Sequence, residues 1–218
     1  MEEESLHYKY TTVASYEKRV QEVGNPLGLD AYFRRRGRHE ADIFLSGLKE
    51  ESLILDLGCG VGLTSLYFWI KEHRVVSTDL GQALLERCRE RGLRNLARLD
   101  QEHVPFAPES FDGVWSHTAL NHVPKAILRE KLCQIGELVK PGAQFFICVK
   151  SSDEGERFHG EKGMEFYYVN FMEGEFEDYL PDDFEITRYN VTEFGRVFMN
   201  FHLRKKQGRP RIKRKADK

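Results

Sequence analysis

Residues 53–62, LILDLGCGVG, constrain the fold of this chain more than any other stretch. An apolar run that ends in three alternating glycines is typical of a buried strand that breaks into a tight turn. Gly58, Gly60 and Gly62 lack a Cβ atom, so the backbone can bend sharply there and approach a ligand closely. The residues that follow have helical composition, and the first turn of a helix presents N–H groups without intrahelical partners. The stretch therefore predicts a ligand site at residues 56–64.

The glycine spacing and the acids further along the chain distinguish between nucleotide cofactors. A dinucleotide fingerprint reads G-x-G-x-x-G, but here the third glycine comes one residue early and Leu63 stands in its usual place. Residues 74–79 form a second short apolar run that ends in Asp79, a carboxylate suited to the two hydroxyls of a ribose. Residues 95–100 end in Asp100 in the same way. The glycine turn alone is also compatible with a plain connection between a strand and a helix, and a hydride-transferring Rossmann enzyme is a further alternative.

Strand-like and helical patterns alternate through the centre of the chain. Short apolar runs predict strands at residues 52–57, 74–79, 95–99, 111–116 and 143–149. Helical patterns lie between them at residues 63–71, 81–91 and 124–139. Residues 184–191 and 196–204 complete the set as a terminal antiparallel hairpin, and 171–180 can form a short helix. The fold class is therefore α/β, with a doubly wound, mostly parallel, seven-stranded sheet.

Five motifs in this order resemble class I S-adenosylmethionine (SAM)-dependent methyltransferases. They are LDLGCGVG at 55–62, STDL at 77–80, LDQEHVPF at 99–106, SFDGVW at 110–115 and LVKPG at 138–142. Each motif alone is weak, but together they cover roughly residues 50–150 in the order of the family. The resemblance implies a Rossmann-like methyltransferase fold, SAM as the cofactor with S-adenosylhomocysteine as product, and methyl transfer by in-line displacement.

The resemblance also implies roles for individual residues. Asp56 and the glycine turn would hold the methionine end of SAM, Asp79 the ribose, and Asp100 with Gln101 the adenine edge. The full set of expected cofactor residues is Asp56, Gly58, Cys59, Gly60, Gly62, Asp79, Leu80, Asp100, Gln101 and Ser116.

Two histidines are candidate general bases if the methyl acceptor must lose a proton. His117 follows the predicted fourth strand and lies near the methyl group by analogy, and His122 stands in the loop after it. A neutral imidazole can accept a proton near pH 7. Packing or loop shape is the alternative explanation for His122.

Composition sets limits on the class of protein. With 218 residues, of which 40% are hydrophobic and 31% charged, the chain suits one globular domain with short additions. The sequence has no apolar stretch of membrane-spanning length, and its acidic start does not resemble a signal peptide, so we expect a cytoplasmic monomer or homodimer without membrane contact. The four cysteines form no C-x-x-C pair, so a metal site is not expected.

Charge is distributed unevenly towards the end of the chain. Residues 151–185 hold twelve acids against Arg157 and Lys162, whereas residues 204–218 hold nine bases against Asp217. We expect residues 1–49 to form a helical cap or lid, 50–204 the SAM-binding domain with an acidic insertion at about 151–180, and 205–218 a disordered basic tail. The tail partly resembles an AT-hook.

The acidic insertion favours a small neutral or cationic methyl acceptor, because negative charge repels a phosphate backbone. Two other functions stay open at this point. One is methylation of RNA, such as tRNA, or of another nucleic acid with help from the basic tail. The other is a noncatalytic protein that binds SAM or a partner protein.

Overall fold

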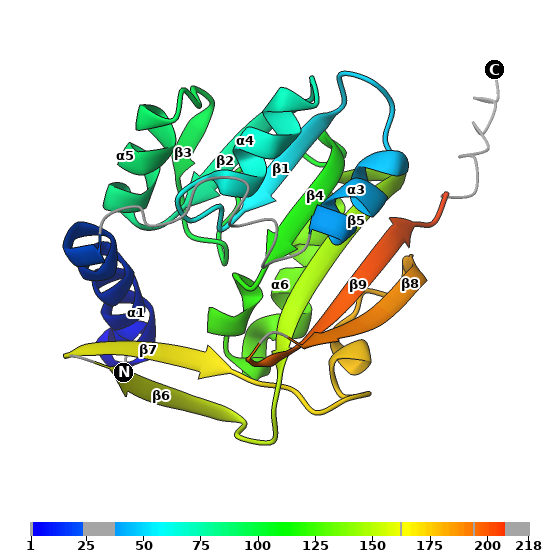
Figure 1. Cartoon of the computed structure of the whole chain (residues 1–218). Helices are drawn as coiled ribbons and strands as arrows, with labels where there is room; N and C mark the ends of the chain where they lie inside the picture. Colours follow the sequence, from blue (N-terminus) through cyan, green and yellow to red (C-terminus); the bar gives the residue numbers. More distant parts are fainter. Residues whose placement is uncertain (1, 24–37, 162, 194, 208–218) are drawn as a thin grey trace, which may run out of the picture.

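A central sheet with helices on both faces forms the body of the protein (Figure 1). The computed structural model describes residues 2–23, 38–161, 163–193 and 195–207. The strands are β1 Leu53–Leu57, β2 Arg74–Asp79, β3 Leu96–Arg98, β4 Phe111–His117, β5 Val139–Ser151, β6 Glu156–Glu161, β7 Met164–Val169, β8 Phe184–Glu193 and β9 Val197–Lys205. The helices are α1 Glu2–Val23, α3 Arg38–Ser46, α4 Leu63–Ile70, α5 Gln82–Glu90 and α6 Lys125–Glu137, with 3-10 turns η1 Leu120–His122 and η2 Phe176–Tyr179.

The main sheet has seven strands in the order β3-β2-β1-β4-β5-β9-β8. Strands β1 to β5 are parallel, whereas β9 is antiparallel to both of its neighbours, β5 and β8. This confirms the predicted α/β, doubly wound, seven-stranded sheet with its terminal antiparallel hairpin. The order in which the chain adds strands to the sheet reverses between β1 and β4, and ligands bind at the carboxyl ends of strands beside such a reversal.

Two apolar cores cover the two faces of this sheet. On one face, Leu128, Leu132 and Ile135 of α6 pack in a core that also contains Leu55 and Phe145. On the other face, side chains of α3 and α4, such as Phe44 and Phe68, surround the indole of Trp115. Because both faces are covered, the central strands are almost wholly apolar, as the sequence suggested.

The limits of α6 and β5 differ from the prediction. Pro124 is extended, at φ −55° and ψ 140°, and precedes the helix instead of occupying its first position. The helix ends at Glu137, and Pro141 and Gly142 lie within β5, which begins at Val139. The pairing of β4 with β5 is irregular between Phe111 and Gly113, so the sheet absorbs a Pro-Gly pair that sequence rules assign to a turn. The helix predicted at residues 171–180 is only the short turn η2.

A second, two-stranded sheet stands apart from the main one. Strands β6 and β7 form an antiparallel hairpin inside the acidic insertion, and helix α1 lies across β7 (Figure 1, blue against yellow). The Oγ1 atom of Thr12 accepts a hydrogen bond from the Tyr167 N–H at 2.9 Å, and the Ser15 Oγ accepts one from the Glu165 N–H at 2.8 Å. Two side chains of the helix therefore occupy the edge of β7 where a third strand would pair.

Some predictions fall outside the described residues. Of the helical cap predicted at residues 1–49, residues 2–23 and 38–49 are described, and the basic tail is described only to Gln207. None of the described helices combines the length and apolar character needed to cross a lipid bilayer.

Candidate functional site

The glycine turn between β1 and α4 has the backbone shape that the sequence predicted. Gly58 and Gly62 both have positive φ, at 71° and 77°. A Cβ atom on Gly58 would lie 2.3 Å from the Ala119 Cβ, and one on Gly62 would lie 2.7 Å from the Cys88 Sγ. A Cβ on Gly60 would instead meet nothing within 4 Å. The turn is thus packed tightly at both ends and borders open space at its centre.

Asp79, the last residue of β2, is joined to this turn by its carboxylate. One oxygen accepts a hydrogen bond from the Gly60 N–H and the other from the Gly81 N–H, each at 2.9 Å. Burial raises the pKa of Asp79 above its ordinary value, while these backbone hydrogen bonds act in the opposite direction. The next residue, Leu80, accepts a hydrogen bond at its carbonyl from the Arg98 side chain at 2.9 Å. The acid is therefore fixed beside the open centre of the turn.

Asp56 is buried, 2% exposed, and its carboxylate faces the interior. It accepts a hydrogen bond from the Ser65 hydroxyl at 2.6 Å, and that hydroxyl in turn accepts one from Ser77 at 2.7 Å. Burial raises the pKa of Asp56 to about 7. The structure thus links Asp56 to α4 and β2, through which it supports the turn.

Cys59 contacts a second cysteine that the sequence did not link to it. Its Sγ lies 3.8 Å from the Sγ of Cys88 on α5. The hydrogen bond to Cys88 and burial raise the pKa of Cys59 well above its ordinary value, so it stays a thiol at neutral pH. This environment suits a small packing residue in the turn better than a nucleophile.

Asp100 and Gln101 lie at the same edge of the sheet. In this structure the Asp100 carboxylate forms an ion pair with a residue of the N-terminal helix α1. Lys9 of α1 binds the Asp100 carboxylate at 2.5 Å and that of Glu102 at 2.9 Å. Tyr8 donates its hydroxyl to Glu102 at 2.6 Å. Gln101 donates its amide to the Ala119 carbonyl at 2.9 Å, beside Gly58. Helix α1 therefore covers the acids that follow β3.

Ser116 and His117 end strand β4 with different surroundings. Ser116 is fully buried, and its hydroxyl has no hydrogen-bond partner among the residues that the structure describes. His117 is partly exposed and stacks with Trp115 and Phe146, at centroid distances of 6.2 and 6.4 Å. The two candidates thus differ: one is an unsatisfied hydroxyl, and the other belongs to an aromatic stack.

His122 lies in a cluster of tyrosines contributed by α1 and β7. Its Nδ1–H donates to the Tyr167 carbonyl at 2.6 Å, and its Nε2 accepts from the Tyr16 hydroxyl at 3.2 Å. The hydroxyl of Tyr168 lies 3.3 Å from that of Tyr16. Burial lowers the pKa of His122 to about 4, so the imidazole is neutral at pH 7.

The sequence did not reveal Lys9, Tyr16 or Glu102 as site residues. The buried side chains of α1 include the polar Lys9, Thr12 and Ser15, so the helix has little of the apolar stripe by which sequence patterns are recognised. The weak signal available was the concentration of tyrosines at residues 8–16. Glu17 of α1 also accepts the Ala83 N–H of α5 at 3.2 Å, so the helix contacts three separate parts of the site.

The described residues include no group of three or more His, Cys, Asp or Glu side chains arranged to hold a metal ion. Tyr16 is partly buried, and burial together with Tyr168 raises its pKa well above the ordinary value, with a smaller contribution from Asp79. The site therefore consists of neutral hydroxyl and imidazole groups beside a carboxylate at the glycine turn.

Comparison with known proteins shows which proteins this chain is similar to. Residues 55–147 match the family model described as a methyltransferase domain. The malonyl-[acyl-carrier protein] O-methyltransferase of Salmonella typhimurium is 32% identical over 108 residues, 48% of this chain and 42% of the relative. The mouse tRNA (carboxymethyluridine(34)-5-O)-methyltransferase ALKBH8 is 28% identical over 156 residues, 71% of this chain and 21% of the relative. The chain thus spans less than half the length of both relatives.

A solved structure extends the likeness to the fold as a whole. The 1,6-didemethyltoxoflavin-N1-methyltransferase of Burkholderia thailandensis, solved with its acceptor and S-adenosylhomocysteine, superimposes with a TM-score of 0.69. The match covers 89% of this chain and 85% of that one, at 22% identity. At this identity the likeness concerns the fold.

Proposed function

We infer that the protein is a class I SAM-dependent enzyme that transfers a methyl group from SAM to a small-molecule acceptor. The match of residues 55–147 to the methyltransferase-domain model supports this proposal. The observation that carries this proposal is the open centre of the glycine turn at Gly60 with the Asp79 carboxylate fixed beside it. A ribose carries two adjacent hydroxyls, which a carboxylate at this position can accept as hydrogen bonds.

The residues at the site fit SAM in two further respects. The unsatisfied hydroxyl of Ser116 is buried at the end of β4, next to the parallel strand β1 that leads into the turn. The Gly58–Gly62 backbone is held away from a helical path by positive φ, so its N–H groups can approach a ligand. When bound, SAM supplies a methyl group on a sulfonium, an electrophile that needs no metal for activation.

The remaining expected cofactor residues keep their assignments within this proposal. We propose that Cys59 and Leu80 line the pocket beside the turn and beside Asp79, and that Gln101, held by the Ala119 carbonyl, meets the adenine edge. Asp56 supports the turn from the interior. Asp100 acts together with Lys9, which couples the adenine side of the site to α1.

Binding of the product S-adenosylhomocysteine tests the cofactor assignment. We expect micromolar affinity by calorimetry, weakened roughly tenfold or more in Asp79→Asn, because a charge-assisted hydrogen bond contributes about 1.5–3 kcal/mol. Glu86→Gln, an exposed position on α5, is the matched control and keeps the affinity of the wild type. A folded protein that binds neither SAM nor S-adenosylhomocysteine would contradict the proposal.

We propose that His122 acts as a proton acceptor through Tyr16 and that His117 orients the acceptor. A hydroxyl that has received the methyl group is a strongly acidic oxonium, so even a base with a pKa near 4 accepts its proton. The proton passes to the Tyr16 oxygen as the Tyr16 proton passes to the His122 Nε2, along the 3.2 Å hydrogen bond.

His122→Asn and Tyr16→Phe are therefore expected to lower turnover on a hydroxyl acceptor by about 10²-fold, the lower end for general base catalysis, with S-adenosylhomocysteine affinity unchanged. If both variants turn over at the wild-type rate, His122 is not a general base, and its role is packing. His7→Asn, at an exposed histidine, serves as the control.

Nucleic-acid methylation is the second candidate function, favoured by the similarity to a tRNA methyltransferase over 71% of this chain. Incubation with labelled SAM and either unfractionated tRNA or a small-molecule extract separates the two. Label incorporated into tRNA, and lost when residues 205–218 are removed, would support the second candidate. SAM binding without transfer to either pool would support the noncatalytic alternative.

The other sequence predictions are retained as part of this proposal. They are the division into a cap at residues 1–49, a SAM-binding domain at 50–204 and a basic tail at 205–218, a cytoplasmic location, and a monomeric or homodimeric state.

A further inference from the structure

A cavity of about 180 Å³ lies where the β6–β7 hairpin meets the end of β5 and the start of β9. In Figure 1 these four strands converge below α6. Lining residues that carry charge or a ring are Lys150, Glu154, Arg157, His159, Tyr168 and Arg196. Nothing in the sequence motifs of the family corresponds to this group, because it comes from three separate segments.

The cavity is positively charged although it lies in the most acidic part of the chain. Lys150, Arg157 and Arg196 provide three cations against the single carboxylate of Glu154. Glu154 holds two of them, Lys150 at 3.5 Å and Arg157 at 2.8 Å, and so orders them at the cavity wall. Arg196 has no ion-pair partner among the residues that the structure describes. An anion in the cavity would therefore meet ordered donors and one unneutralised guanidinium.

Neighbouring acids of the insertion are engaged elsewhere. Glu156 accepts hydrogen bonds from the Tyr167 hydroxyl and the Lys125 N–H. Glu175 pairs with the Lys125 ammonium, and Asp182 pairs with Arg129 of α6 at 3.0 Å. The negative charge counted along the sequence is thus partly neutralised by α6. The sequence argument for a neutral or cationic acceptor does not hold at the cavity itself.

Tyr168 connects the cavity to the proposed site of methyl transfer. Its ring lines the cavity, with the Lys150 ammonium 5.7 Å from the ring centroid. Its hydroxyl lies 3.3 Å from that of Tyr16, and its ring centroid lies 5.1 Å from that of His122. The Lys150 N–H also donates to Asn121, the residue before His122, at 3.2 Å. A ligand group in the cavity is therefore one tyrosine away from the groups that would handle the acceptor proton.

The size of the cavity limits what it holds. Pockets for whole drug-sized ligands measure roughly 300–1,000 Å³, so this one suits a single acidic group and not a complete acceptor. Arginine and lysine together recognise carboxylate and phosphate oxygens through charge-assisted hydrogen bonds.

We propose that this cavity binds the carboxylate or phosphate of a small-molecule methyl acceptor, and that Tyr168 lies between this anchor and the methylated atom. The inference rests on the proposed function in so far as it names the ligand a methyl acceptor. The anion site itself can be tested without methyl transfer.

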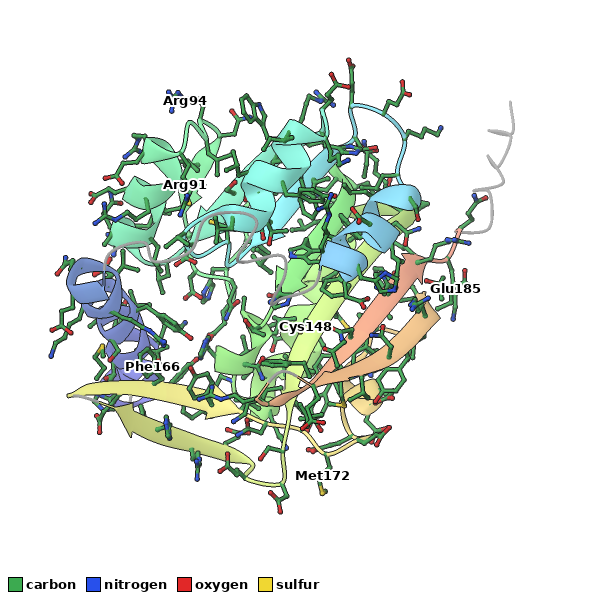
Figure 2. The ribbon with its side chains drawn as sticks, in the orientation of Figure 1. Arg91, Arg94, Cys148, Phe166, Met172 and Glu185 are labelled. Carbon is green, nitrogen blue, oxygen red and sulfur yellow. The ribbon has the colours of Figure 1, made fainter. Side chains whose placement is uncertain are left out.

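The experiment is a titration of the ¹⁵N-labelled full chain with sodium malonate and, separately, with sodium phosphate at constant ionic strength. We expect amide shifts confined to Lys150, Arg157, Tyr168 and their chain neighbours, and saturation in the millimolar range. The Arg157→Gln/Arg196→Gln variant weakens binding roughly tenfold or more, because it removes two charge-assisted donors. Both arginines are exposed, so the fold tolerates the change. Arg94→Gln, an arginine labelled in Figure 2 on the far side of the sheet from the hairpin, is the matched control.

The two anions identify the group that the cavity prefers. Stronger binding of malonate assigns a carboxylate acceptor, and stronger binding of phosphate assigns a phosphorylated one. Shifts scattered over the surface, or equal binding by the double variant, would overturn the proposal. Displacement of malonate by tRNA with the same dependence on the two arginines would also overturn it, in favour of a nucleic-acid ligand.

Affinity for S-adenosylhomocysteine is measured on the same samples. If the double variant keeps its affinity for S-adenosylhomocysteine but no longer binds malonate, the anion site is separate from the cofactor pocket. If the wild type binds malonate but no S-adenosylhomocysteine, the proposed function fails while the anion site stands.

Discussion

At the residue scale, burial decides which protonation state each site residue carries. Asp56 is buried and His122 is partly buried, and burial favours the neutral form of each. The pKa of Asp56 rises to about 7 and that of His122 falls to about 4. The two residues therefore affect stability in opposite directions as the pH changes.

The folded protein is expected to lose stability through His122 as the pH falls from 6.5 to about 4. In this window the imidazole is protonated in the unfolded chain but neutral in the folded one, so unfolding takes up a proton. The loss amounts to at most roughly 3 kcal/mol, since one pKa unit corresponds to about 1.36 kcal/mol. Urea denaturation of the wild type and of His122→Asn at several pH values measures it.

The free energy of unfolding of His122→Asn should decrease less than that of the wild type between pH 6.5 and about 4, whatever the stability of the variant at pH 7. His7→Asn removes an exposed histidine and should leave the wild-type curve unchanged. Parallel curves for the wild type and His122→Asn would mean that the imidazole is not held neutral. Asp56 acts oppositely: its raised pKa makes the folded state more stable below pH 7 than above it, so Asp56→Asn is the second reference.

At the element scale, helix α1 completes a sheet that would otherwise have an open edge. Among the described strands, β7 pairs only with β6, and its Glu165 and Tyr167 N–H groups donate to Ser15 and Thr12 of the helix. Side chains one helical turn apart thus match two alternate residues of a strand. This contact positions Tyr16, which follows Ser15, next to His122.

Thr12→Val is expected to destabilise the protein by about 1–3 kcal/mol, because it preserves shape but leaves the buried Tyr167 N–H without an acceptor. Hydrogen exchange of the Tyr167 amide should accelerate more than that of amides in β4. Thr11→Val is the matched control, since the Thr11 hydroxyl makes only an exposed contact with His7. Equal effects of the two substitutions would show that the hydrogen bond to β7 contributes no stability.

At the scale of the whole molecule, α1 joins parts of the site that are far apart in the sequence. Lys9 binds Asp100 after β3, Glu17 caps the first turn of α5, and Tyr16 contacts His122 after β4. Any ligand that orders one of these contacts also favours the others.

Saturating S-adenosylhomocysteine is therefore expected to slow hydrogen exchange in α1 as well as in the glycine turn. Ligand at about 100 times its dissociation constant stabilises the folded state by roughly 2.7 kcal/mol, which raises the melting temperature by about 5–10 °C in a domain of this size. Lys9→Met should reduce the protection of α1 more than that of α4. Protection confined to the turn and α4 would contradict a role of α1 as a lid.

Much of the fold could be predicted because its signals are local. The apolar run before Asp56 and the glycines after it specify a strand and a turn through backbone geometry alone. Acids that end two strands then fall at one edge of a parallel sheet. The predicted limits failed at Pro141 and Gly142, which lie in an irregular part of β5 between its pairs with β4 at Val139 and Gln144.

The cap and the hairpin were not predictable in the same way. The buried side chains of α1 include several polar ones, so its periodicity carries little hydrophobic signal. Residues 151–180 could be recognised only as an acidic insertion. Lys125, which neutralises Glu175, comes from α6, and Phe166 packs on Tyr16 of α1, so both contacts depend on distant parts of the chain.

By itself, the sequence determined the parallel sheet, the glycine turn and the acids beside it, since each depends on residues within a few positions of one another. Only the tertiary structure decided which groups surround the acceptor side. Tyr16, His122, Tyr168 and Arg196 meet there across more than a hundred positions of the chain, and the charge of the cavity follows from which cations lack a partner in space. Charge summed along a segment cannot express this, because electrostatic interaction depends on distance in three dimensions.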